Sequence, residues 1–248
     1  MTGTRPRRSP EQEQRHRRQR LAAALRIFAA RGFGEGAGGH VTARDPIRPD
    51  RFWVNPFGMY FGHVRVSDLL LVDHDGRVVQ GQGTVNPAGY AIHSQIHAMH
   101  PHVVAAAHTH SLYGRAWAAL GRPLAPITQD VCAFYERHAV FEEYTGVVLD
   151  LDEAKRIGQR LAGNTALVLR NHGLLTAGGS VEEAAWWFLS MDRSCQVQLL
   201  AEAAGETRLI EPDAARAARD TIGTPGVARL NFRPLYDDIV RRQPDLLT

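Results

Sequence analysis

Two histidines separated by one residue have the spacing in this sequence that most clearly points to metal binding. His108 and His110 follow the apolar run 103–107, and His172 follows a second apolar run, 166–169. Side chains two residues apart in a strand point to the same face, so His108 and His110 can bind one ion together. A third histidine at the end of a neighbouring strand would complete a site with open coordination positions. Such a site is typical of a catalytic metal ion rather than a structural one.

The composition is that of an ordinary globular protein. The chain has 248 residues, of which 44% are hydrophobic and 22% charged, enough for one large domain with a sizeable core. No apolar run is long enough to span a membrane, and no apolar segment of a secretory signal follows the N-terminus. Two cysteines, Cys132 and Cys195, are too few for a disulfide framework. We therefore expect a cytoplasmic protein.

The basic character of the chain lies in its first twenty residues. They hold seven arginines and two glutamates, a net charge of +5. Subtracting this from the whole-chain +3 leaves −2 for the remainder. Nucleic-acid binding requires basic residues clustered on a folded face. We expect no nucleic-acid or membrane partner, and we interpret residues 1–20 as a solvated, disordered arm.

The hydrophobic pattern predicts short strands and several helices. Helices are expected over 21–30, 91–100, 112–120, 153–162, 181–204 and 214–220. Strands are expected over 40–44, 52–54, 69–72, 78–79 and 147–149, and around residues 127 and 139. Residues 224–248 read as an irregular tail. Several of these strands are joined by hairpins, and helices lie between the others. This combination predicts an α/β fold with a mainly antiparallel sheet layered by helices.

Three segments in this order resemble the class II aldolase and adducin family. They are Gly39–Arg44, Ala107–Ser111 and Asn171–Leu174, and the resemblance covers about residues 20 to 205. It implies an α/β/α fold with a mainly antiparallel, nine-stranded central sheet. It also implies one divalent metal ion per subunit, held by His108, His110 and His172, and a homotetramer with active sites between subunits.

The same resemblance divides the chain into three parts. These are the arginine-rich arm 1–20, a class II aldolase-like domain 21–210, and a C-terminal tail 211–248 that would pack at a subunit interface.

The sequence departs from the sugar-phosphate aldolases of this family at two places. Their Ser-Ser-Glu element, about nineteen residues before the first metal histidine, reads Pro87-Ala88-Gly89 here, so the proton-carrying glutamate is absent. Their phosphate loop, of Gly-Asn-Ile-Ser type, reads 39–42 with His40 in place of the asparagine. Phosphate binding needs converging N–H and O–H donors. We therefore exclude a sugar-phosphate aldolase or epimerase.

Two further segments, 52–58 and 128–135, resemble one branch of the family. This branch includes non-haem iron oxygenases of aminocoumarin antibiotic biosynthesis, which act on prenylated 4-hydroxyphenylpyruvate-type acids. Aromatic residues near the first segment either line an apolar substrate pocket or pack in the core: Trp53, Phe57, Tyr60 and Phe61. The candidate substrate-binding residues are Gly39, Phe57, Gly58, Ala88, Gly89 and Gln129.

The missing glutamate affects two possible chemistries unequally. A Zn²⁺ or Mn²⁺ lyase needs a positioned base, an effect of roughly 10²–10⁴ in rate. In oxidative decarboxylation, iron and dioxygen carry the difficult step. We therefore favour Fe²⁺ and predict an enzyme that cleaves a carbon–carbon bond beside a carbonyl in a non-phosphorylated, aromatic 2-oxo or 2-hydroxy acid. The alternatives are a Zn²⁺- or Mn²⁺-dependent aldolase or decarboxylase without oxygen, and a non-catalytic adducin-like scaffold.

Two residues are candidates for the missing base. The resemblance implies that His40 lies on the metal side of the phosphate loop, and that Tyr135 could reach the site from a segment near a subunit boundary. Three further histidines, His93, His97 and His100, share one face of a predicted helix. Packing or hydrogen bonding is their expected role.

Overall fold

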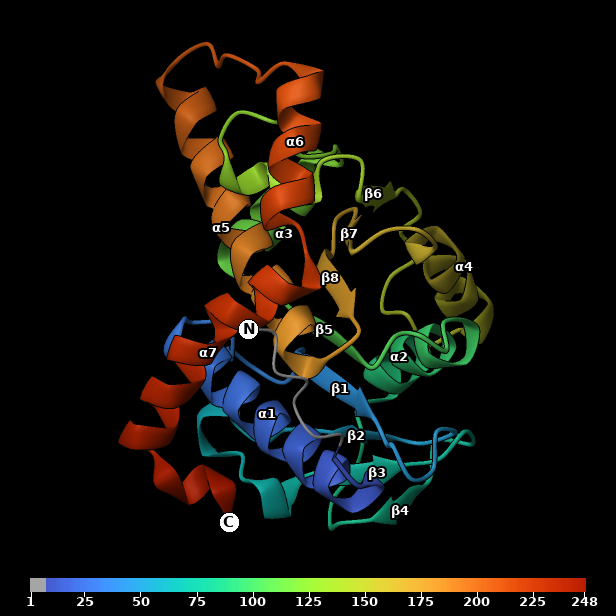
Figure 1. The fold of residues 1–248 in the computed structure, drawn as a ribbon. Helices are drawn as coiled ribbons and strands as arrows, with labels where there is room; N and C mark the ends of the chain where they lie inside the picture. Colours follow the sequence, from blue (N-terminus) through green and yellow to red (C-terminus); the bar gives the residue numbers. More distant parts are fainter. Residues whose placement is uncertain (1–7) are drawn as a thin grey trace.

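One eight-stranded sheet forms the centre of the computed structural model, which describes residues 8–248 (Figure 1). The strand order is β4-β3-β2-β1-β5-β8-β7-β6, and every pair is antiparallel except β6 and β7. The strands are β1 (His40–Arg44), β2 (Phe52–Val54), β3 (Leu70–Val72), β4 (Val78–Gln80), β5 (Ala105–Thr109), β6 (His138–Phe141), β7 (Ala166–Leu169) and β8 (Gly173–Gly178).

The predicted α/β class and mainly antiparallel sheet are confirmed, but the count of nine strands is wrong for the described residues. The strands expected at 147–149 and around residue 127 do not form. Val147 and Leu149 are 74% and 62% exposed, in a loop that leads into a helix. Their apolar side chains have no neighbouring strand to pair with, so the pattern alone was misleading.

Helices cover both faces of the sheet, which confirms the α/β/α layering. On one face lie α1 (Pro10–Ala30), α3 (Leu112–Leu120), α5 (Val181–Ala204) and α7 (Pro225–Arg242), and on the other α2 (Pro87–Met99) and α4 (Leu151–Leu161) (Figure 1). α6 (Pro212–Ile222) precedes α7. The short 3₁₀ turns are η1 (Phe61–His63), η2 (Val66–Asp68), η3 (Asp130–Phe134) and η4 (Pro244–Leu247).

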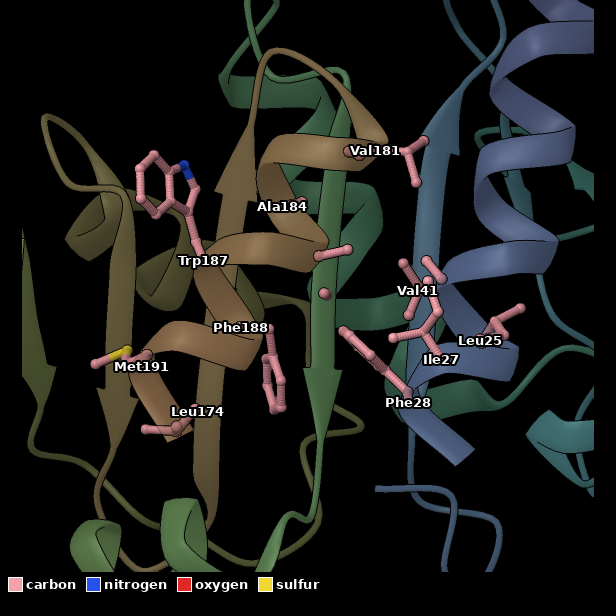
Figure 2. Packing of buried hydrophobic residues seen from close by; sticks show 14 of the residues in the cluster. Leu25, Ile27, Phe28, Val41, Leu174, Val181, Ala184, Trp187, Phe188 and Met191 are labelled. Carbon is pink, nitrogen blue, oxygen red and sulfur yellow. The ribbon is translucent and has the colours of Figure 1, made fainter. Parts of the chain in front are cut away.

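The core divides along the two faces of the sheet. On the α1/α5 side, Phe28 and Phe188 pack with ring centroids 5.2 Å apart (Figure 2). Ala107 of β5 belongs to this cluster, whereas Ala106 belongs to the cluster beneath α2 and α4. Because strand side chains alternate, His108 shares the face of Ala106 and points towards α2.

The N-terminal arm is not disordered where the structure describes it. α1 begins at Pro10, after a capping box in which Ser9 and Gln12 exchange hydrogen bonds. Arg18 stacks over the Trp53 ring at 4.3 Å, and Arg20 interacts with Glu182. The prediction of a solvated arm is therefore wrong for residues 10–20, because their charged side chains pack on the folded body. Residues 1–7 lie outside the described part of the chain.

The C-terminal residues are also better ordered than the sequence suggested. α6 confirms the helix expected over 214–220, whereas residues 224–248 form α7 and η4 instead of an irregular tail. Phe232, Ile239 and Leu246 are fully buried in the main core cluster. Asp245 accepts a hydrogen bond from the buried Arg26 at 2.7 Å. This segment completes the core of its own chain, while its role at a subunit interface stays a prediction.

None of the helices in residues 8–248 combines the length and the apolar character needed to cross a bilayer.

Candidate metal centre

The fold brings His108, His110 and His172 together at one end of the sheet. His108 lies in β5, His110 directly follows that strand, and His172 lies in the turn between β7 and β8. Asn171 allows this tight turn by adopting a positive φ of 60°. The ligand atoms of the three histidines all lie within 4.8 Å of one another. Metal–nitrogen bonds of about 2.0–2.1 Å place two donors about 3–4 Å apart, so small ring rotations suffice to hold one ion.

A backbone carbonyl fixes the tautomer of His108. Its Nδ1 lies 2.8 Å from the carbonyl oxygen of Leu174. A carbonyl can only accept a hydrogen bond, so Nδ1 carries the proton and Nε2 presents a lone pair. A ligating histidine is commonly oriented in this way.

Burial favours the neutral, metal-binding form of all three rings. It lowers the pKa of His108 well below its usual range and, with a smaller effect of His110, the pKa of His172 to about 4. The pKa of His110 is lowered by burial and by the charge of Arg115. Only a neutral imidazole can bind a metal ion, so the rings are ready to bind near neutral pH.

Two glycines allow the chain to approach these rings. A Cβ on Gly38 would lie 2.9 Å from Nδ1 of His110, and one on Gly173 would lie 3.2 Å from the Thr109 carbonyl oxygen. Gly38 belongs to none of the sequence motifs described above. Its signal was the run of glycines before β1, which marks close approach of the backbone to another group.

His40 lies against the centre and fills the space of a missing side chain. It is the cross-strand partner of His108, and the two ring centroids are 5.0 Å apart. A Cβ on Gly89 would overlap Cδ2 of His40 and lie 2.9 Å from its Nε2. The His40 ring therefore occupies the volume into which a side chain at position 89 would project. Burial lowers the pKa of His40 to about 3, so the ring is neutral.

The N-terminus of α2 satisfies its own backbone donors. Asn86 caps the helix, and its side-chain oxygen accepts from the N–H groups of Ala88 and Gly89 at 3.0 and 3.2 Å. These are two of the N–H groups that a helix start would offer to a phosphate. Gly39 is also enclosed, since a Cβ there would lie 2.7 Å from the Phe61 ring.

The other predicted site residues lie further out. Phe57 is 46% exposed, and Gly58, with φ of 78°, belongs to the same exposed turn. Gln129 is exposed at the start of η3, and Tyr135 is half-buried at its end. No hydrogen bond or ring contact within residues 8–248 links Tyr135 to the three histidines. The roles proposed for these residues stay predictions.

The four candidate pocket aromatics separate into two pairs. Trp53 is fully buried and its Nε1 donates to Asp45, while Phe61 is 4% exposed, so both are core residues. Tyr60, at 48%, is exposed like Phe57. Only the second pair is free to meet a substrate.

A separate cavity lies away from the three histidines. It has a volume of about 860 Å³ and is lined by residues of α3, α5 and α7, among them Tyr113, Trp186 and Leu235. These helices cover the sheet face opposite the one that His108 faces. The lining of this cavity does not include the three histidines.

Comparison with known proteins agrees with this geometry. The chain is 43% identical over 231 residues (92% of this chain, 86% of the relative) to decarboxylase NovR of Streptomyces niveus. It is 43% identical over 229 residues (92% and 83%) to 4-hydroxy-3-prenylphenylpyruvate oxygenase/4-hydroxy-3-prenylbenzoate synthase of Streptomyces roseochromogenus subsp. oscitans. The solved structure of L-fuculose 1-phosphate aldolase from Glaciozyma antarctica PI12 superposes with a TM-score of 0.90 at 39% identity, covering 99% of this chain and 97% of that one. Residues 19–199 match the class II aldolase and adducin N-terminal domain, and the chain belongs to this family.

Proposed function

We propose that this protein is an iron(II)- and dioxygen-dependent enzyme that oxidatively decarboxylates a non-phosphorylated, aromatic 2-oxo or 2-hydroxy acid. One observation carries the proposal. A three-histidine centre lies beside an imidazole that occupies the space of residue 89, where the aldolases carry their glutamate. The site thus keeps its metal-binding side chains but has no carboxylate at that position.

The three imidazole nitrogens suit a divalent metal ion, and class II aldolases use such an ion. Bound iron would supply Lewis acidity and the activation of dioxygen, with three protein ligands leaving positions free for reactants. His108 is held by the Leu174 carbonyl with Nε2 available as a donor. His40, against His108 and Gly89, is the nearest candidate to hold or accept a proton at Nε2.

The substrate class is inferred from what the site does not offer. The Ala88 and Gly89 N–H groups are already bonded to Asn86, so a phosphate would find neither free. Phe57 and Tyr60 are exposed aromatic side chains that could contact an aromatic ring. The printed names of two relatives, a decarboxylase and a prenylphenylpyruvate oxygenase, support the same substrate class.

The proposed reaction balances without an external reductant. One 3-aryl-2-oxo acid (an arylpyruvate) and one dioxygen give a 2-hydroxy acid shorter by one carbon, and carbon dioxide. That hydroxy acid and a second dioxygen give an arylcarboxylate, carbon dioxide and water. Dioxygen is the oxidant in both steps, and the bond broken in each joins the carboxyl carbon to its neighbour.

The test uses full-length protein purified without oxygen and loaded with Fe²⁺ or Zn²⁺. An oxygen electrode and carbon dioxide detection would follow a panel of arylpyruvates and aryl 2-hydroxy acids. We expect matched dioxygen uptake and carbon dioxide release with iron only. His172→Ala should abolish both, while His74→Ala, at an exposed histidine in the β3–β4 hairpin, should not. No uptake across the panel would contradict the proposal.

A lyase is the second candidate, favoured by the similarity to a solved protein named as an aldolase. It would use Zn²⁺ or Mn²⁺ and turn over without oxygen, releasing an aldehyde or carbon dioxide. The same panel under nitrogen distinguishes it. An adducin-like scaffold is the third, and it has no physical need for three converging neutral imidazoles.

We also propose a homotetramer acting on a small molecule in the cytoplasm. Membership of the family supports the small-molecule substrate. In such an assembly, Tyr135 would act on the site of a neighbouring subunit.

A further inference from the structure

The cavity on the α3/α5 side of the sheet has the size of a small-molecule site. Its volume of about 860 Å³ lies within the range of about 300–1,000 Å³ that ligand pockets occupy. α5 packs against both α3 and α7, and all three helices contribute to the walls (Figure 1). The lining includes Leu112, which is 63% exposed, and Trp187, which is 4% exposed. The cavity therefore runs from the surface towards the core.

One face of α5 forms a wall of this cavity. At intervals of three or four residues, this face presents to the cavity Trp186, Ser190, Arg193 and Val197. Phe188, on the opposite face of the helix, is fully buried in the main core cluster. The helix therefore packs the core with one face and lines the cavity with the other.

Asp192 of α5 places a buried carboxylate in the lining. The residue is only 4% exposed, and its Oδ1 accepts a hydrogen bond from the Gly114 N–H at 3.0 Å. A carboxylate offers about four acceptor positions, and within residues 8–248 this is the one hydrogen bond that it accepts. Burial raises the pKa of this carboxyl, and the nearby Ser111 hydroxyl, which opposes the rise, forms no full hydrogen bond. Most of the acceptor capacity of Asp192 is not used by the described chain.

The other charged residues of the lining are exposed and balance one another. They are two arginines and two acids: Arg31, Arg193, Glu35 and Asp130. Water and salt screen exposed charges, but they screen a buried charge much less. The inner part of the cavity is therefore negative because of Asp192, and it disfavours an anionic ligand.

Aromatic and aliphatic side chains complete the walls. Tyr113 precedes Gly114, the residue whose N–H Asp192 accepts, and Trp186 and Leu235 are half-buried. Aromatic rings attract organic cations, and apolar walls favour burial of an apolar ligand body. This combination suits a ligand that has an aromatic body and a cationic end.

We propose that this cavity binds an aromatic amine, whose ammonium group donates to Asp192 and whose apolar body lies between α3, α5 and α7. The site lies on the sheet face opposite to the one that His108 faces, and it does not depend on the proposed reaction. A residue that only capped the Gly114 N–H would need a single acceptor. A neutral side chain would supply it without the cost of burying a charge.

The test uses three probes that share a fluorescent dansyl group and differ at the end of a pentyl chain. Dansylcadaverine ends in an ammonium group, N-pentyl dansylamide in a methyl group and N-dansyl-6-aminohexanoate in a carboxylate. Dansyl fluorescence rises in apolar surroundings, so titration of the full-length native protein gives each affinity. We expect a Kd of about 10 µM for the ammonium probe, as is usual for a ligand of its size. It should bind about 10- to 100-fold more tightly than the other two.

Four variants locate the probe. Asp192→Asn keeps an acceptor for the Gly114 N–H but removes the charge, so the ammonium probe should bind no better than the neutral one. Asp130→Asn, at an exposed acid of the same lining, is the matched control and should change the affinity by less than about twofold. Ser190→Phe, which adds a ring to the cavity wall, should weaken all three probes. His172→Ala should retain binding, because the probe does not touch the metal centre.

Equal affinities of the native protein for the three probes would overturn the proposal, as would equal losses in Asp192→Asn and Asp130→Asn. Binding that appears only after dilution to single chains would show that a second copy of the chain fills the cavity, and would also overturn it. Native selectivity and Ser190→Phe decide the question even where Asp192→Asn fails to fold. Since no readout involves turnover, failure of the proposed function leaves this test intact.

Discussion

At the residue scale, the sequence departs from the sugar-phosphate aldolases at positions 40 and 89, and these two departures form one structural change. The His40 ring fills the volume that a Cβ at position 89 would need. A side chain at position 89 therefore requires the ring at position 40 to move or to be replaced. A glutamate restored at position 89 alone would displace His40 before it could act on a substrate.

This coupling predicts the outcome of a double-mutant cycle. Gly89→Ala should lower the free energy of unfolding by about 1–3 kcal/mol, because overpacking forces the His40 ring to move. In a His40→Ala background, the same change should be neutral or stabilising by about 0.5–1 kcal/mol, since alanine is the better helix residue. Urea unfolding of the four proteins measures the coupling.

Gly226→Ala is the control for this cycle. Gly226 lies in the first turn of α7, and a Cβ there meets nothing nearer than Thr224 Oγ1 at 4.0 Å. This change should not destabilise the protein. An equal effect of Gly89→Ala with and without the His40 ring would show that the two residues do not compete for space.

The sequence predicted that three histidines come together better than it predicted what surrounds them. His108, His110 and His172 follow apolar runs, and strand periodicity is a local property that a sequence displays. The contacts of His40 with Gly89 and His93 join β1 to α2, which are far apart along the chain. No local pattern encodes such a contact. The spacing of four residues between His93 and His97 indicated only that both share one helix face.

At the element scale, α1 shows how a charged helix can belong to a folded body. Its first half is rich in arginine and glutamate, which reads as solvated. The capping box of Ser9 and Gln12 with Pro10 was the available local signal for its start. What the sequence could not show is that His16 and Arg20 meet Glu182 of α5, since this pairing depends on tertiary structure.

Glu182 is expected to hold α1 in place. Burial alone would raise the pKa of this carboxyl, but a hydrogen bond from His16 and the charge of Arg20 hold it at about 2. The carboxylate stabilises the fold above the unfolded pKa of about 4.5, and this stabilisation is lost as the pH falls towards 2. Glu182→Gln should lower the free energy of unfolding at pH 7 by about 1–3 kcal/mol.

Urea unfolding at pH 7 checks this value, with Glu206→Gln at an exposed position as control. Amide hydrogen exchange should show the loss as faster exchange in the first half of α1. Unchanged stability and exchange in Glu182→Gln would mean that α1 is held by its apolar face alone.

At the scale of the whole molecule, the two faces of the sheet differ in chemistry. The α1/α5 face is an apolar core, whereas the α2 face contains neutral histidines near the centre. The layered fold class followed from the mixture of helix and strand patterns. The burial of these histidines did not follow from the sequence, because a histidine in a sequence carries no sign of whether it will be buried.

This asymmetry makes the metal-free protein sensitive to acid. Burial lowers the pKa of His40 and His97 to about 3, while histidines in the unfolded chain titrate near 6.5. The unfolded state therefore binds more protons between these values, so stability is complete above about pH 6.5 and falls as the pH drops below it. Each such ring contributes up to about 1.4 kcal/mol per pH unit.

Urea unfolding of metal-free protein at several values between pH 5 and 7.5 measures this slope. We expect the free energy of unfolding to fall steeply below pH 6.5, and His97→Gln to reduce the slope by about one proton. His74→Gln should leave it unchanged, because the His74 side chain is 75% exposed. A pH-independent stability would mean that these rings gain protons in the folded protein as readily as in the unfolded chain, which would contradict their neutral state.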